Sequence, residues 1–167
     1  MIGAIDIGGT KIVVGLVDEA GTVHARTRMP TDLAVAPRVM LERMRDALRD
    51  LSGGAALRGV GVGCTGPVDP LTGRAGTIDL LPGWEGVDLL APFIELGLSA
   101  ALENDADAAA LGEAAWGAGR DAERFIYVTI STGIGAGLVF DGRLYRGARG
   151  SHPEIGHHIL DASGSRT

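Results

Sequence analysis

The chain has 167 residues and a formal net charge of −6, with 46% of its residues hydrophobic and 22% charged. Globular domains usually span roughly 100–200 residues, so these values predict one folded domain and exclude a disordered chain, a collagen-like repeat or a coiled coil. An acidic balance argues against a nucleic-acid partner, because phosphate binding needs a basic surface. Glycine is frequent, with 27 residues, which indicates tight turns or backbone close to a ligand.

In the first part of the chain, apolar segments alternate with glycine-containing turns. Three β-branched segments predict an antiparallel meander, at residues 2–7, 11–18 and 22–28. A helix is expected from Pro37, with apolar residues at helical spacing, and Ser52-Gly53-Gly54 should end it. A buried strand follows at 59–64. The Gly- and Pro-rich stretch 65–86 predicts a long loop, which is uncommon in compact domains unless it serves a function.

The second part continues the alternation of helices and strands. The expected elements are a helix within 87–98, a strand at 100–103, a helix at 106–116, a strand at 125–131, a glycine turn at 132–137 and strands at 138–140 and 143–145. This order predicts an α/β fold with a mixed sheet and flanking helices, in one domain over residues 1–167.

One cysteine, Cys64, cannot form a disulfide within the chain, which fits a reducing compartment. No apolar run approaches the roughly 18 residues that a membrane helix needs. The N-terminus lacks the basic start and apolar stretch of a signal peptide. We therefore expect a cytoplasmic protein with no membrane partner.

The stretch Asp6-Ile7-Gly8-Gly9-Thr10-Lys11 places a carboxylate at the end of a strand and a glycine turn directly after it. The two glycines would let backbone N–H groups approach an anion. The threonine and the lysine would add a hydrogen bond and a positive charge, and the aspartate could hold Mg²⁺ through its water shell. An ordinary hairpin turn explains the two glycines as well.

A second glycine loop, Ser131-Thr132-Gly133-Ile134-Gly135-Ala136-Gly137, also lies between apolar strands. Neither loop is a Walker A motif or a Rossmann fingerprint. Paired strand–glycine–strand turns are the pattern of the actin-like ATPases, in which two hairpins hold the phosphates of a nucleotide.

Between these loops, Glu103-Asn104-Asp105-Ala106-Asp107 joins a short strand to a helix N-terminus. A carboxylate there could accept a proton from a substrate hydroxyl during phosphoryl transfer. Alternatively, Asn104 or Asp105 only caps the helix, as these residue types often do. The two neighbouring glycine loops favour the general-base interpretation.

Three of the four histidines gather in His152-Pro153-Glu154-Ile155-Gly156-His157-His158. This cluster suggests a metal site, but one cysteine cannot complete a Cys-rich zinc site within the chain. The alternative is that Glu154 and His157 hydrogen-bond the hydroxyls of a substrate.

Together and in this order, these motifs resemble the ROK family (repressor, open reading frame, kinase), and within it the N-terminal lobe of the glucokinase-like sugar kinases. The resemblance covers almost the whole chain. The matching segments are 6–11 (DIGGTK), 61–69 (GVGCTGPVD), 102–113, 132–137 and 147–157.

The resemblance implies a ribonuclease-H-like lobe of the actin/hexokinase superfamily, and phosphorylation of a hexose hydroxyl by ATP with Mg²⁺. Asp105 would be the general base. The residues implied to bind the sugar are Gly66, Asn104, Asp105, Glu154 and His157. Those implied to surround the phosphates and Mg²⁺ are Asp6, Gly8, Gly9, Thr10, Lys11, Thr132, Gly133 and Gly135.

The chain departs from the family pattern in three places. Leu80 stands where an asparagine that contacts the sugar often lies, which argues against assigning glucose specifically. Ser131 and Ala136 replace glycines of the second loop, and both are small. The chain ends before the Cys-x-Cys-Gly-x-x-Gly-Cys zinc motif and the second lobe. His157 matches a family zinc ligand, but no zinc is expected here.

These departures leave alternatives to a sugar kinase. One lobe cannot close over both substrates, so a non-catalytic sugar-binding or regulatory fragment is the main alternative. A repressor of the same family is not expected, because its winged helix would precede the DIGGTK loop, which begins at residue 6. Apolar surface that fits the missing lobe predicts a homodimer.

Overall fold

The computed structural model describes residues 1–131, 133–147, 153–159, 161 and 163. Two compact units make up the chain, Met1–Asp105 and Ala106–Thr167. The single domain expected over residues 1–167 stays a prediction. Among the residues just given, no helix has the length and apolar character needed to cross a membrane.

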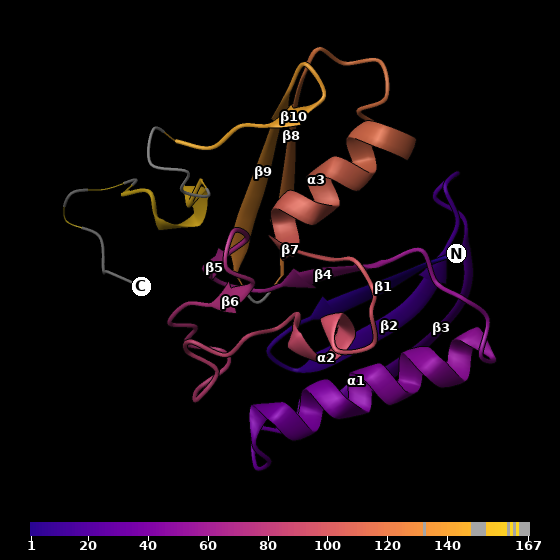
Figure 1. Cartoon of the computed structure of the whole chain (residues 1–167). Helices are drawn as coiled ribbons and strands as arrows, with labels where there is room; N and C mark the ends of the chain where they lie inside the picture. The colour runs from indigo at the N-terminus through magenta and orange to yellow at the C-terminus, as the bar shows by residue number, and fades with distance from the viewer. Residues whose placement is uncertain (132, 148–152, 160, 162, 164–167) are drawn as a thin grey trace. The chain divides into compact units, whose positions relative to one another are not determined.

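The main sheet of the first unit has five strands in the order β3-β2-β1-β4-β7 (Figure 1). They are β1 (Ile2–Ile7), β2 (Lys11–Val17), β3 (Val23–Pro30), β4 (Val60–Cys64) and β7 (Ala100–Asn104). β1, β2 and β3 form the expected antiparallel meander, whereas β4 runs parallel to β1 and β7 runs parallel to β4. The prediction of a mixed sheet is confirmed.

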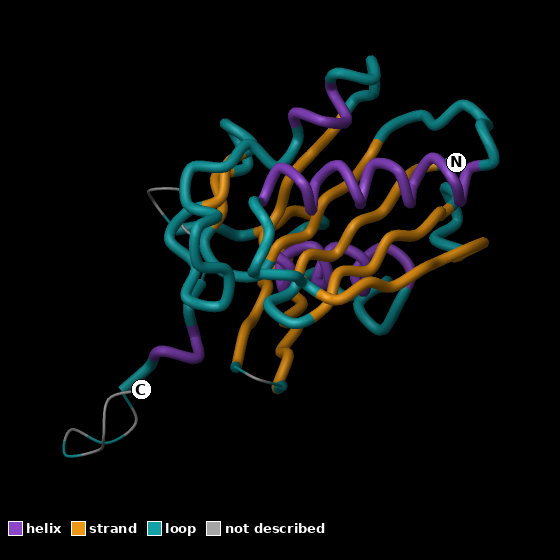
Figure 2. The backbone as a smooth tube through the Cα atoms, turned by 90° about the horizontal axis from the view of Figure 1, so that it is seen from below, coloured by secondary structure: helices purple, strands orange, loops and turns teal. Residues whose placement is uncertain are grey.

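Helix α1 (Pro37–Ser52) lies along one face of this sheet (Figures 1 and 2). Pro37 is tolerated in the first turn because its missing N–H would have no helical partner there. Gly53 ends the helix with a left-handed φ of 56°. The apolar side of α1 enters the core of the unit through its buried side chains, Met40, Leu41, Met44 and Leu48.

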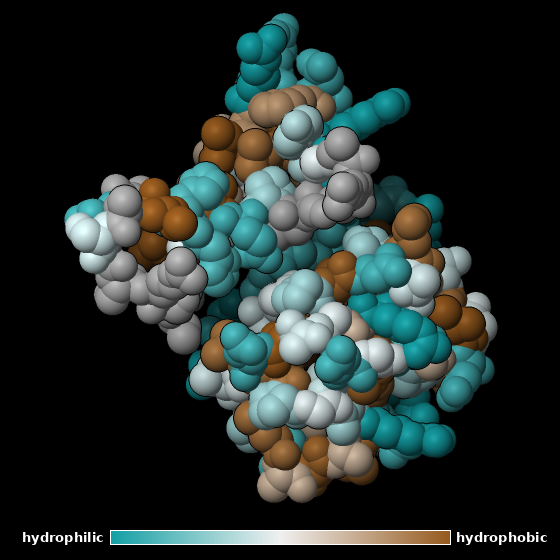
Figure 3. All heavy atoms as spheres, turned by 90° about the vertical axis from the view of Figure 1, so that its left-hand side faces the viewer, coloured by the Kyte–Doolittle hydropathy of each residue, from teal (hydrophilic) through white to brown (hydrophobic). Residues whose placement is uncertain are grey.

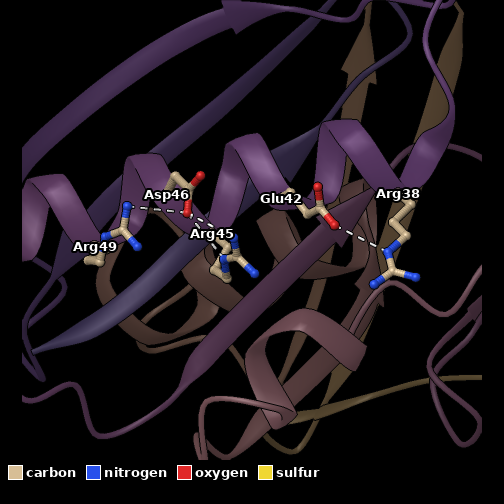
Figure 4. A network of polar contacts seen from close by, with 5 residues as sticks. All are labelled: Arg38, Glu42, Arg45, Asp46 and Arg49. Atoms are coloured by element: carbon tan, nitrogen blue, oxygen red, sulfur yellow. Dashed lines mark hydrogen bonds and ion pairs between the residues drawn. The ribbon is translucent and has the colours of Figure 1, made fainter.

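The exposed side of α1 carries ion pairs (Figure 4). Arg38 pairs with Glu42 at 3.2 Å, and Asp46 pairs with Arg45 at 3.1 Å and Arg49 at 3.4 Å. Exposed pairs of this kind contribute about 0–1 kcal/mol each. The helix is therefore held mainly by its apolar side.

The segment predicted as a long loop contains a hairpin of β5 (Val68–Asp69) and β6 (Arg74–Ala75). The Asp69 carboxylate holds the turn, since it accepts hydrogen bonds from the Leu71 N–H at 2.9 Å and the Thr72 hydroxyl at 2.7 Å. Beyond the hairpin, the chain is anchored in the core by Ile78, Leu81 and Trp84. Helix α2 (Ala91–Ile94) is much shorter than the range 87–98 in which a helix was expected.

The second unit contains an antiparallel sheet in the order β10-β9-β8. Its elements are β8 (Arg124–Ile130), β9 (Ile134–Phe140), β10 (Arg143–Leu144) and the 3₁₀ turn η1 (Ile155–His157), and helix α3 (Asp105–Trp116) begins at the last residue of the first unit.

The glycine turn predicted over 132–137 is wrong from Ile134 onward, because β9 begins at that residue. Gly137 lies so close to α3 that a Cβ added to it would be 2.5 Å from the Ala110 Cβ. Gly135 is similarly close to Ala106, at 3.3 Å. These glycines sit in a strand and let a helix pack closely against it.

Apolar side chains on the surface are mixed with hydrophilic ones over the face drawn in Figure 3. Several large apolar residues are exposed in each unit. They include Leu71, Leu80 and Leu96 in the first and Ile126, Val128 and Ile130 in the second.

Candidate active site

The first glycine turn closes the hairpin between β1 and β2. The Gly8 N–H donates to the Lys11 carbonyl at 3.0 Å, so this N–H belongs to the hairpin itself. Within the described part of the chain, the N–H groups of Gly9 and Thr10 donate no hydrogen bond. The hairpin and the phosphate-loop interpretations are thus compatible, with Gly9 and Thr10 as the donors that an anion could use.

Thr31 holds this turn in place by hydrogen bonds, and this role of Thr31 was not predicted from the sequence. Its hydroxyl donates a 2.7 Å hydrogen bond to the Gly8 carbonyl, and its N–H donates to the Thr10 carbonyl at 3.1 Å. Thr31 follows directly after β3, and pairing of β3 with β2 brings it to the turn. No local sequence signal marks this contact, because it depends on strand register.

Asp6 and Asp105 are brought to one edge of the five-stranded sheet. Asp6 lies near the end of β1 and Asp105 follows β7, and both strands run in the same direction on either side of β4. Carboxyl ends of parallel strands meet at one edge, where ligands commonly bind in α/β sheets.

The surroundings of the Asp6 carboxyl raise its pKa above the ordinary value. Its side chain keeps contact with water, but the surrounding protein removes enough of that water to raise its pKa. The charge of Asp105 raises the pKa further, and Lys11 lowers it. Two nearby carboxylates fit a divalent cation that keeps most of its water. Among the described residues, no three or more metal-ligating side chains gather into a site built entirely by protein.

Asn104 is 5% exposed, and its amide Nδ2 donates to the Gly66 carbonyl at 3.1 Å. Gly66 has a φ of +77°, and a Cβ there would lie 2.8 Å from the Ile78 side chain. The hydrogen bond from Asn104 therefore positions the backbone at Gly66. Direct contact of either residue with a sugar stays a prediction.

Cys64 ends β4 beneath this edge and is completely buried. Burial, followed by the charges of Asp105 and Asp6, raises the pKa of its thiol to about 12. The thiol is therefore neutral near pH 7 and unsuited to act as a nucleophile.

In the second unit, the 3₁₀ turn η1 packs against β9, which follows the second glycine loop. The Ser131 N–H donates to the Gly133 carbonyl at 2.9 Å, which closes the turn. η1 packs at the start of β9, where Gly156 lies directly against the Ile134 carbonyl. The predicted phosphate ligand Thr132 lies outside the described residues, as does His152.

Glu154 directly precedes η1, and His157 is the last residue of η1. Both side chains are exposed to solvent. The Glu154 Oε2 and the His157 Nε2 are 3.9 Å apart, and the side chains of Glu154 and His157 are 51% and 73% exposed. Both are open to a ligand, and His157 faces a carboxylate. The predicted residues thus form two groups. Those up to Asp105 lie in the first unit, and Gly133, Gly135, Glu154 and His157 lie in the second.

A protein-family model described as ROK family matches residues 2–167, nearly the entire chain. The chain belongs to the ROK family. The resemblance carried by its motifs is therefore confirmed.

Relatives of this ROK chain include sugar kinases. The glucokinase of Thermotoga maritima is 33% identical, over 96% of this chain and 51% of that protein. The fructokinase of Zymomonas mobilis is also 33% identical, over 94% of this chain and 53% of its own length. The chain spans about half the length of the curated relatives it matches.

Solved structures agree with this assignment. A ROK family glucokinase from Streptomyces griseus, in complex with glucose and AMPPNP, superposes with a TM-score of 0.83 and 31% identity. The match covers 98% of this chain and 52% of that one. The mixed sheet with flanking helices is the actin/hexokinase fold of the ROK sugar kinases, as predicted.

Proposed function

We propose that this ROK chain supplies the general base and the phosphate loops of a kinase that transfers phosphate from ATP to a hexose hydroxyl. The observation that carries the proposal is the meeting of Asp6 and Asp105 at one sheet edge beside the glycine turn. The Streptomyces griseus glucokinase, whose crystals hold glucose and AMPPNP, supports both substrates.

In this mechanism, Asp105 accepts the proton of the sugar hydroxyl as its oxygen bonds to the γ-phosphorus and the bond to ADP breaks. The N–H groups of Gly9 and Thr10, with the Lys11 ammonium, stabilise the phosphate charge. Mg²⁺, held by Asp6 through water, would neutralise further negative charge.

The remaining predicted residues complete the proposal. Gly66, Asn104, Glu154 and His157 would orient the sugar, and Thr132, Gly133 and Gly135 would face the phosphates. That His157 holds no zinc in this chain stays a prediction. A cytoplasmic location and a homodimer are further expectations, the second because β8 exposes Ile126, Val128 and Ile130.

The test is a coupled assay of ADP release by the 167-residue chain, with ATP, Mg²⁺ and a panel of hexoses. Asp105→Asn should lower turnover by about 10²–10⁴-fold, the usual contribution of a general base. Asp121→Asn is the matched control, because Asp121 is exposed and outside the proposed site. It should leave turnover unchanged.

Retention of turnover in Asp105→Asn would refute the role of Asp105. A second outcome, saturable hexose binding with no turnover by the parent chain, would favour the alternative of a non-catalytic sugar-binding or regulatory chain. Hexose binding should therefore be measured beside turnover, by saturation-transfer NMR on the same samples.

A further inference from the structure

The peptide between Gly8 and Gly9 is weakly constrained by sterics. A Cβ added to Gly9 would lie 2.7 Å from the Leu80 Cβ, so a larger residue does not fit there. A Cβ added to Gly8 would lie 3.1 Å from the Lys11 carbonyl oxygen, which is also tight. Since glycine accepts φ values of either sign, a peptide with glycine on both sides turns over easily. Close packing around the turn thus requires residues that leave this peptide free to rotate.

The orientation of the Gly8–Gly9 peptide decides what the turn offers to an anion. A peptide unit is planar and trans, so its C=O and its N–H point in opposite directions. The Gly8 carbonyl and the Gly9 N–H belong to the same unit. Whichever way the carbonyl points, the N–H points the other way. A reversed peptide would replace an N–H that attracts a phosphate by an oxygen that repels it.

Thr31 holds this peptide in one orientation. Its hydroxyl donates to the Gly8 carbonyl at 2.7 Å, across 23 positions of the sequence. Its own N–H donates to the Thr10 carbonyl at 3.1 Å, which anchors Thr31 at its backbone. The Gly8 carbonyl is therefore turned toward Thr31 and the Gly9 N–H away from it. Within the described part of the chain, that N–H donates no hydrogen bond.

We infer that Thr31 is a positioning residue for the donor phosphates, because its hydroxyl locks the Gly8–Gly9 peptide with the Gly9 N–H directed at them. This inference rests on the proposed function. Thr31 touches neither substrate and acts through Gly9. An N–H that is oriented in advance binds a charge without reorganisation of the turn. The lock should therefore act on phosphate affinity and leave sugar affinity unchanged.

The experiment measures three dissociation constants by calorimetry on the 167-residue chain, for Mg²⁺-pyrophosphate, Mg²⁺-AMPPNP and glucose. Thr31→Val keeps the shape of the side chain and removes the hydroxyl. It should weaken both phosphate compounds by about tenfold, the effect of one hydrogen bond to a charged group. Glucose affinity should stay within about twofold. Pyrophosphate, which has no nucleoside, separates the phosphate contact from any contact with adenosine.

Thr31→Ser restores the hydroxyl and should bind both phosphate compounds within about twofold of the parent. Thr27→Val is the matched control, because it makes the same change at another half-buried threonine, within β3 and away from the turn. It should leave all three constants unchanged. If circular dichroism shows that Thr31→Val does not fold, Thr31→Ala carries the same expectation.

The orientation of the Gly9 N–H can also be observed directly, without a ligand. Its residual dipolar coupling in ¹⁵N NMR should be the same in the parent and in Thr31→Ser. In Thr31→Val it should change, because the peptide then samples both orientations. An unchanged coupling in Thr31→Val would contradict the lock.

Phosphate affinities within about twofold of the parent in Thr31→Val would overturn the role of Thr31 and leave the proposed function intact. Equal losses in Thr31→Val and Thr31→Ser would do the same, because the hydroxyl would then not be the cause. No binding of either phosphate compound to the parent chain would overturn both the role of Thr31 and the proposed function.

Discussion

At the scale of single residues, the raised pKa of Asp6 has a consequence for stability. A carboxyl with a pKa above its unfolded value of 3.8 is charged at a cost in the folded chain. The free energy of unfolding should therefore fall as the pH rises from the unfolded pKa through the folded pKa. Asp6→Asn removes the charge and should remove this loss.

The check is urea denaturation of both chains between acidic and neutral pH, in buffer with EDTA so that no cation binds the carboxylates. Asp6→Asn should gain stability relative to the parent as the pH rises, and the two chains should converge in acid. A difference that is constant with pH would contradict the assigned cause. The same variant should bind Mg²⁺-nucleotide less tightly under the proposed function.

The sequence placed Asp6 and Asp105 near strand ends, and the structure agrees, but their roles in a site stay predictions. Asp6 lies one residue before the end of β1 and Asp105 directly follows β7, and carboxylates near strand ends have a recognisable sequence pattern. Thr31 and Leu80 touch the glycine turn only because of strand register and the path of a long connection. No local pattern of residues encodes such contacts.

At the scale of elements, the contact between β9 and α3 within the second unit predicts opposite effects for two glycine substitutions. Gly137→Ala would place a Cβ 2.5 Å from Ala110 and 2.7 Å from the Ala106 carbonyl, so it should destabilise the chain by about 1–3 kcal/mol. Gly112→Ala lies in α3 with open space around it and should stabilise the chain by roughly 0.5–1 kcal/mol.

The two stability changes are measured from the urea denaturation midpoints of the Gly137→Ala and Gly112→Ala variants, with the parent chain as reference. A stabilised Gly137→Ala would show that the helix does not need the glycine strand. Since both changes add one methyl group, the comparison separates local crowding from the general preference of a helix for alanine.

The same contact explains why the second glycine loop was extended too far by sequence reasoning. A run of glycines predicts a turn when only backbone freedom is considered. In β9, Gly135 and Gly137 allow helix α3 to pack closely against the strand. A local run of residues cannot predict this contact, because α3 lies about 30 residues earlier in the sequence. The β5–β6 hairpin was missed for a different reason, because strands of two residues are too short to show alternation.

At the scale of the whole molecule, the buried apolar cluster of the five-stranded sheet lies entirely within residues 1–105. A chain that ends at Asp105 should therefore fold by itself. It should unfold cooperatively and keep the near-ultraviolet signal of the buried Trp84. In this shortened chain, Met44→Ala should cost about 2–5 kcal/mol, as expected for a truncated core side chain.

Circular dichroism during urea denaturation checks both statements. A broad transition, or a Met44→Ala variant with unchanged stability, would show that the first unit needs residues 106–167 to fold.

The overall order of helices and strands was predictable from apolar periodicity. The division into two compact units was not, because neither a linker nor a change of composition marks residue 105.

The burial of Cys64 makes the chain a convenient host for site-directed labels. Its only thiol is inaccessible and stays protonated at the pH of maleimide coupling. A cysteine introduced at an exposed position, such as Leu71 or Ile126, would therefore carry the single thiol that reacts with a maleimide in the native protein. Fluorophores or spin labels can then be attached at one chosen point without first removing a natural cysteine.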